Sequence, residues 1–120
     1  MIQIQKTKIY DLEERTLEYG KRIIHLSRSL PKDVANDTIS GQLMRSGTSL
    51  GANYREANET VTKKDFSFRM RICRKEAKET VYWLQLVVEA NPDLDKRVSP
   101  LLQETRELVK IFAAIIEKSK

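Results

Sequence analysis

The longest regular pattern in this sequence spans residues 62–91, TKKDFSFRMRICRKEAKETVYWLQLVVEAN. Apolar or small side chains recur in it at alternating steps of four and three residues, at Phe66, Met70, Cys73, Ala77, Thr80, Leu84 and Val87. Such spacing places these side chains along one side of an α-helix. Thr62 followed by Asp65 is typical of a helix start, and Asn91-Pro92 is typical of a helix end. We therefore predict one helix across this segment.

Two segments that precede this one in the sequence show the same spacing of apolar residues. A first seam begins at Leu12, and we predict a helix from Asp11 to Ser29, because the residue before Pro31 is disfavoured in helical geometry. A second seam covers residues 39–57. Both segments are therefore expected to be amphipathic helices.

A fourth seam follows Pro100, and Ser99 before that proline is typical of a helix start. Four such helices joined by short connections predict an all-α, antiparallel up-down-up-down four-helix bundle. We expect residues 11–120 to form this single domain and residues 1–10 to form a flexible N-terminal tail.

Composition excludes several classes of protein. With 40% hydrophobic and 32% charged residues, the chain can fill a core but has no apolar run of membrane-spanning length. Its first residues contain no stretch of signal-peptide character, so we expect a cytoplasmic protein with no membrane partner. Cys73 is the only cysteine, which excludes an internal disulfide and a cysteine-based metal cage. No cofactor and no metal are expected.

Positive charge is concentrated in the third predicted helix. The window 63–78 holds seven cations and two acids, a surplus of five that equals the net charge of the whole chain. On a helical wheel, a basic face lies away from the core seam and comprises Lys64, Arg71, Lys75 and Lys78, with Arg74 on its flank. A focused positive field attracts nucleic-acid phosphates, so we predict RNA or DNA binding here. An ordinary solvated helix face is the alternative.

The same helix carries a second apolar stripe, made of Phe68, Ile72, Trp83 and Leu86. An aromatic patch outside the core favours a contact between copies of the chain, although a helix packed between two neighbours could bury a wide arc by itself. Gly47 and Gly51 lie one turn apart and would let another backbone approach closely. A locally softened helix is the alternative for these two glycines.

Two carboxylate pairs, Glu56/Glu59 and Glu76/Glu79, keep an enzymatic alternative open. Pairs one turn apart on neighbouring helices can hold Mg²⁺ for hydrolysis of nucleotide pyrophosphates. The wheels place all four sideways or outward, as expected of surface glutamates. Cys73 lies in the core seam and is expected to be a small core residue, not a nucleophile. We therefore predict that the chain is not an enzyme.

Three segments carry a family resemblance: DLEERTLEY (11–19), QLMRSGTSLGANYREA (42–57) and RICRKEAKETVYWL (71–84). They resemble the small four-helix bundle proteins encoded inside intervening sequences of bacterial 23S ribosomal RNA genes. This resemblance implies a bundle that assembles as a ring, commonly a pentamer, with a basic surface. It is also similar in fold to the accessory subunit of diversity-generating retroelements, which partners a reverse transcriptase and nucleic acid.

The family has no settled catalytic residues, so the resemblance implies no enzymatic role. Arg45 and Arg55 lie within the matching string and join the candidate phosphate contacts, with an ion pair to Glu56 or Glu59 across a subunit boundary as the alternative. We thus expect a homo-oligomeric accessory or scaffold protein that binds RNA or DNA. A protein-interaction module without nucleic acid, with a protein partner such as a reverse transcriptase, and a Mg²⁺-dependent pyrophosphohydrolase are the alternatives.

Overall fold

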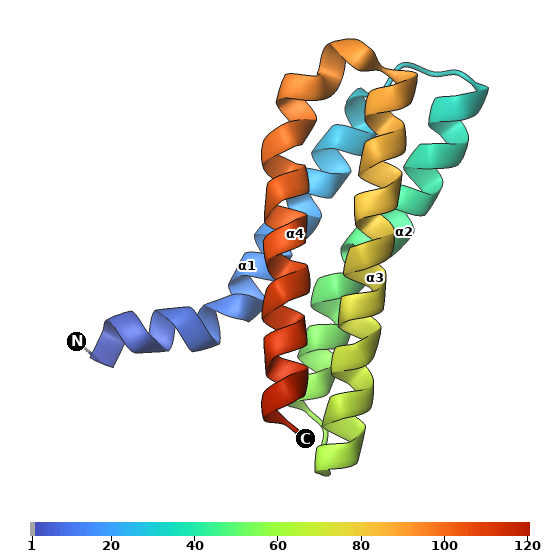
Figure 1. Cartoon of the computed structure of the whole chain (residues 1–120). Coiled ribbons are helices and arrows are strands. Elements are labelled where there is room, and N and C mark those ends of the chain that lie inside the picture. The colour runs from blue at the N-terminus through green and yellow to red at the C-terminus, as the bar shows by residue number, and fades with distance from the viewer. Residues whose placement is uncertain (1) are drawn as a thin grey trace.

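Four α-helices follow one another along the chain in a computed structural model, which describes residues 2–120, with side chains from Leu12 onward. They are α1 (Ile2–Ser29), α2 (Val34–Asn58), α3 (Lys63–Ala90) and α4 (Asp95–Lys118), with a 3₁₀ turn, η1 (Pro92–Leu94), before the last. Figure 1 shows the chain direction reversing at each connection. The predicted all-α, antiparallel four-helix bundle is confirmed, and the described residues contain no strand.

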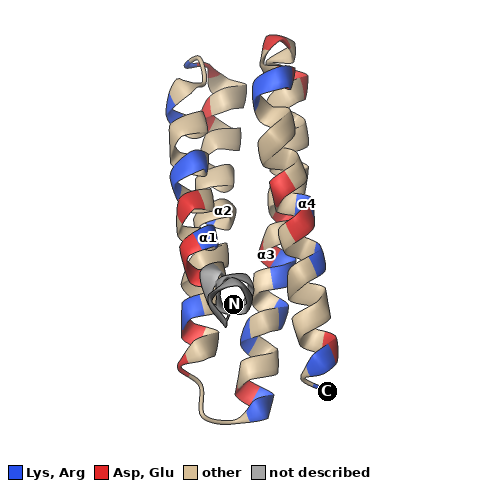
Figure 2. Ribbon diagram, turned by 90° about the vertical axis from the view of Figure 1, so that its left-hand side faces the viewer, with Lys and Arg blue, Asp and Glu red and all other residues tan. Residues whose placement is uncertain are grey.

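The predicted seams meet in one core. Fully buried side chains come from every helix, among them Ile23 of α1, Leu50 of α2, Leu84 of α3 and Phe112 of α4. Each helix packs against the next one along the chain, whereas α1 and α4 share the smallest contact. In Figure 2, α1 and α2 form one pair and α3 and α4 the other.

Side-chain hydrogen bonds fix the start of α2 and α3. The Thr62 hydroxyl accepts from the backbone N–H of Asp65 at 3.1 Å, as predicted, and the Asp33 carboxylate accepts from the N–H of Asn36 at 2.7 Å. These caps satisfy N–H groups that have no partner inside the helix.

Two buried asparagines join the start of α2 to the end of α3. Asn36 Nδ2 donates to Asn91 Oδ1 at 3.0 Å, and Asn91 Nδ2 donates to Asn36 Oδ1 at 2.8 Å. Asn91 Nδ2 also donates to the carbonyl of Val87 at 2.9 Å. Because both amides are partnered, their burial carries little of the usual desolvation cost.

Polar contacts tie α1 to α4 across their smaller contact. Arg15 binds Glu104 through two hydrogen bonds of 2.7 and 2.8 Å and reaches Glu107 at 3.0 Å. Deeper in, the hydroxyls of Tyr19 and Thr105 lie 2.5 Å apart. Burial raises the pKa of Tyr19, so this phenol stays protonated and available as a donor.

Two helix starts differ from prediction. α4 begins at Asp95, so the predicted start at Ser99 is wrong. Pro100 is tolerated early in the helix because its missing N–H leaves only one carbonyl of the first turn without a donor, and Pro100 is exposed to solvent. α1 is helical from Ile2, before Asp11. The predicted flexible tail, residues 1–10, lies outside the side chains that the structure describes.

No helix within residues 2–120 combines the length and the apolar character that crossing a lipid bilayer requires.

Gly47 and Gly51 allow α2 to approach α1. A Cβ at Gly47 would lie 2.8 Å from Cγ1 of Ile23, and a Cβ at Gly51 would lie 3.0 Å from Oγ1 of Thr16. Gly47 is also buried. The close neighbour is therefore α1 of the same chain, which corrects the prediction that these glycines face a second copy.

This packing predicts that Gly47→Ala is less stable than Gly41→Ala. Both changes replace a mid-helix glycine of α2, and each gains about 1 kcal/mol of helix propensity. Gly41 is exposed with nothing within 4 Å of an added Cβ, whereas the methyl at position 47 meets Ile23. Overpacking should make the Gly47 variant less stable by about 1–3 kcal/mol relative to the Gly41 variant in urea unfolding. Equal stabilities would contradict the close approach.

Candidate nucleic-acid interface

The outward face of α3 follows from the burial of its seam. Met70, Cys73, Ala77 and Leu84 are completely buried, and α2 and α4 pack on either side of the helix. Side chains half a turn away must then point to solvent, because direction in an α-helix is fixed by position. Figure 2 shows lysine and arginine positions in the half of α3 that lies near the end of α4.

Most of the predicted basic face is available to a ligand. Lys64, Arg71 and Lys78 are exposed and Arg74 is half-buried. Among the carboxylates described from Leu12 onward, none forms an ion pair with these four residues. Arg71 donates only to the Ser67 hydroxyl, at 3.4 Å. The positive charges of these four residues are therefore not neutralised by a described carboxylate and remain available to a ligand in solvent.

Two other cations of the window have acidic partners. Arg69 lies 3.0 Å from a Glu56 oxygen and also donates to Asn53 Oδ1 at 3.1 Å, so it belongs to the contact between α2 and α3. Lys75 is exposed, with its ammonium 3.8 Å from a Glu76 oxygen. Exposed pairs at this distance contribute little, so Lys75 remains part of the basic face.

Arg45 and Arg55 are engaged elsewhere. Arg45 lies 3.2 Å from Glu76 and also pairs with Glu79, both on α3 of the same chain. Arg55 lies 3.8 Å from Glu13 on α1. Arg45 thus pairs within its own chain, and its partners are not Glu56 or Glu59. The exposed Arg55 pair contributes little at its distance, and both arginines lie on α2, apart from the α3 cations.

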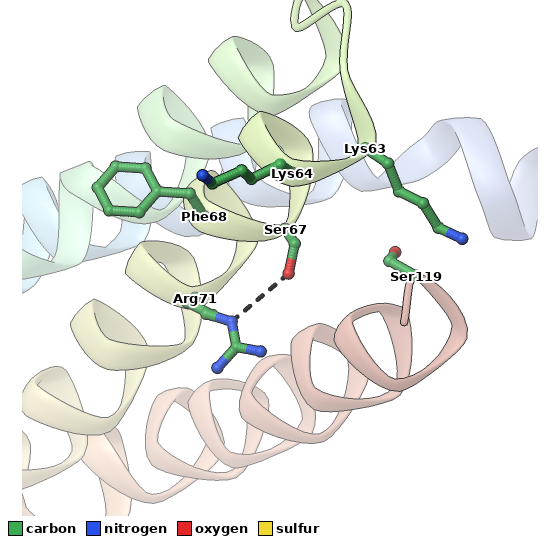
Figure 3. Close-up of a pocket in the computed structure, with 6 residues that line it drawn as sticks. All are labelled: Lys63, Lys64, Ser67, Phe68, Arg71 and Ser119. Carbon is green, nitrogen blue, oxygen red and sulfur yellow. Dashed lines mark hydrogen bonds between the residues drawn. The ribbon is translucent and has the colours of Figure 1, made fainter.

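A hollow of about 570 Å³ lies where the start of α3 meets the end of α4. Its lining consists of Lys63, Lys64, Ser67, Phe68, Arg71 and Ser119. Figure 3 shows Lys64 and Phe68 on one side of α3, with Arg71 directed toward Ser67. Sequence reasoning considered the face of α3 alone and missed the part played by α4, although an antiparallel bundle already places the start of α3 beside the end of α4.

The positive field also reaches the end of α4. Lys120 donates to Glu117 at 2.8 Å and is the main reason why the pKa of Glu117 is lowered, while Arg71 and Arg74 lower this pKa further. Glu117 thus stays ionised. Its lowered pKa shows that Arg71 and Arg74 of α3 lie close enough to stabilise its negative charge.

The predicted apolar stripe exposes less surface to solvent than expected, because three of its four side chains are half-buried. Phe68 is 59% exposed, but Ile72, Trp83 and Leu86 are half-buried, and the last two pack against the core of their own chain. The Trp83 indole N–H donates to Glu79 at 2.8 Å. Only part of this stripe therefore remains for a contact between copies.

Three of the four glutamates of the enzymatic alternative are in ion pairs with arginines. Glu56 pairs with Arg69, and Glu76 and Glu79 pair with Arg45. Glu76, which the wheels place sideways or outward with the other three, is buried, so the expectation of a surface glutamate is wrong for this residue. Among the described residues, no group of three or more acidic, histidine or cysteine side chains is arranged to hold a metal ion.

Cys73 occupies the core, as predicted. Its thiol donates to the carbonyl of Leu50 at 3.8 Å, and burial raises its pKa to about 12. A thiolate is the nucleophilic form of cysteine, so a thiol with this pKa is unreactive near neutral pH.

Comparison with known proteins identifies a family and similar solved structures. A family model described as 23S rRNA-intervening sequence protein matches residues 8–114. The chain is also similar to a crystal structure from Bacteroides thetaiotaomicron, described as a protein of unknown function from the S23 ribosomal protein family. The two are 32% identical with a TM-score of 0.78, over 87% of this chain and 96% of that one. No curated protein matches the chain.

The burial of Cys73 predicts that the folded protein resists thiol-specific reagents at pH 7–8. The same reagent should label one cysteine per chain in denaturant, because unfolding removes the desolvation that raises the thiol pKa. Absorbance of the released chromophore measures both reactions. Rapid labelling of folded protein would contradict a core role for Cys73.

Proposed function

The chain belongs to the family of 23S rRNA-intervening sequence proteins, and we propose that it is a non-enzymatic bundle that binds the phosphate backbone of RNA or DNA. The observation that carries this proposal is a cluster of cations on one half of α3, for which the described carboxylates provide no ion pair: Lys64, Arg71, Arg74 and Lys78. Lysine and arginine that neutralise phosphates release condensed counterions, and this release drives association.

Recognition in this proposal is independent of nucleotide sequence. The cations lie on the outer surface of a helix packed between α2 and α4, where they meet phosphates more readily than base edges in a groove. The hollow beside Lys63 and Arg71 extends this surface toward α4. An accessory or scaffold role, in which the protein holds nucleic acid without chemical change, fits such contacts.

The proposal includes assembly of several copies, in the ring of five that the family resemblance implies. Ile72, Trp83 and Leu86 are its candidate contacts, because they leave apolar surface in water on the α2 side of α3. A ring repeats the basic face, and linked contacts raise the overall affinity well above that of one site.

We expect the triple variant Arg71→Gln, Arg74→Gln, Lys78→Gln to bind a labelled RNA more weakly than the unmodified chain. Titrations by fluorescence anisotropy at several salt concentrations should show a salt slope shallower by about one for each phosphate contact removed.

A matched control is Arg28→Gln, Lys32→Gln, Lys96→Gln, which removes the same charge from exposed sites at the other end of the bundle. The control should bind almost as the unmodified chain does. Equal losses in both variants would show a net-charge effect and contradict this surface. Binding of a cellular protein that survives nuclease and high salt, with no RNA or DNA binding, would instead favour a protein-interaction module.

For assembly, we expect light scattering to give a mass that is a multiple of 13.9 kDa. Ile72→Glu should shift this mass toward one chain, because it places a charge in an apolar contact. The control Val61→Glu makes a similar change at a residue that is 96% exposed and should leave the mass unaltered. A single-chain mass for the unmodified protein would contradict the assembly.

A further inference from the structure

A second regular stripe runs along the outer side of α3, half a turn away from the buried seam. Its members recur at steps of four and three residues: Lys64, Phe68, Arg71, Lys75, Lys78 and Tyr82. All six are exposed. The same helical period that builds the core therefore aligns four cations with two aromatic rings on one line.

The two rings are unusual in being exposed. Phe68 is 59% exposed and Tyr82 is 53% exposed, and from Leu12 onward every other aromatic side chain is buried or half-buried. Leaving aromatic surface in water is unfavourable, since burial of apolar area is the main driving force of folding. The rings lie near the two ends of the cationic stretch. This placement indicates a ligand that offers flat apolar faces between negative charges.

The cations beside the rings can accept such a ligand. Lys64, Phe68 and Arg71 line the hollow near Ser119. Figure 3 shows Lys64 and Phe68 directed to the same side of α3, whereas Arg71 is directed toward Ser67. Lys78 lies one turn from Tyr82, and no described carboxylate pairs with it. Phosphate contacts are thus available next to each ring.

The Tyr82 ring is held in place. It meets the Trp83 ring edge to face, with centroids 5.0 Å apart and planes at 71°. Trp83 is in turn held by its hydrogen bond to Glu79 and by contact with the core. A ring whose orientation is fixed before binding loses little conformational entropy when a flat group stacks on it.

We propose that this stripe binds single-stranded nucleic acid, with phosphates on the cations and unpaired bases stacked on Phe68 and Tyr82. The inference rests on the proposed function and adds the strandedness of the ligand. In a duplex the base faces are covered by neighbouring pairs and cannot reach a protein ring, whereas single strands stack readily on exposed aromatic side chains. The fourteen helical steps from Phe68 to Tyr82 span ~21 Å, which leaves room for about six nucleotides of a stacked strand.

The test uses three DNA probes of equal length: a labelled fifteen-nucleotide oligothymidine, its duplex with oligoadenine, and a fifteen-unit abasic strand. The abasic strand keeps the phosphates and lacks the bases. We expect the unmodified chain to bind oligothymidine at least roughly tenfold more tightly than the other two probes, because only this probe can stack on the rings. An oligouridine of the same length distinguishes RNA from DNA.

The variant Phe68→Ala, Tyr82→Ala should lose roughly tenfold in affinity for oligothymidine per ring and should change little with the duplex or the abasic strand. Its salt slope should stay unchanged, since the phosphate contacts remain. The control Leu17→Ala, Met44→Ala removes two exposed apolar side chains outside the stripe and should have no effect on any probe.

Two outcomes overturn the inference, and they differ from failure of the proposed function. Equal affinity for the single strand and the duplex would leave backbone binding intact and remove the role of the rings. Equal losses with all three probes in the double-ring variant, together with a lower mass in light scattering, would place the rings between copies of the chain. If no probe binds, the proposed function itself fails.

Discussion

Burial of one seam of α3 governs what the rest of the helix can present to solvent. Met70, Cys73, Ala77 and Leu84 are completely buried between α2 and α4, and a helix cannot rotate without exposing them. Loss of several such contacts would cost more than a typical domain can spare, because each buried side chain contributes about 1.5–3 kcal/mol. The opposite side is thereby held outward along its whole length. The rotation of α3 about its own axis thus determines both the core packing and the direction in which the basic face points.

Acidic residues restrict the positive charge to part of that outer surface. On the α2 side, Glu76 and Glu79 bind Arg45, and Glu56 binds Arg69, so arginines and glutamates neutralise one another. Toward α4, the acid near the arginines of α3 is Glu117, which Lys120 already engages. The positive field is therefore directed toward solvent and α4, and buried Glu76 serves the contact between helices.

The bundle itself was predictable because a period of 3.6 residues is a local property of the chain. The Thr62 cap and the seam residues Leu50, Leu84 and Phe112 were found in this way. Contacts between helices were not predictable, because they depend on which helices become neighbours and how each is rotated. Small residues at Gly47 and Gly51 correctly indicated a close approach, but the sequence alone did not identify α1 as the partner. The helical period showed that the cations of α3 share one face. The ion pairs of Arg45 and the hollow beside Ser119 became visible only in the three-dimensional structure.

The reciprocal amide pair of Asn36 and Asn91 has an effect far from its own position. If α3 slid by one turn along α2, about 5.4 Å, the two amides would part while still inside the protein, and each unsatisfied group would cost about 1–3 kcal/mol. The pair therefore acts as an axial stop at one end of the bundle. Because α3 is a single continuous helix, this contact also fixes the positions of Lys64 and Arg71 along the direction of α2. A contact between two uncharged amides thus helps to determine the position of charged side chains at the opposite end of α3.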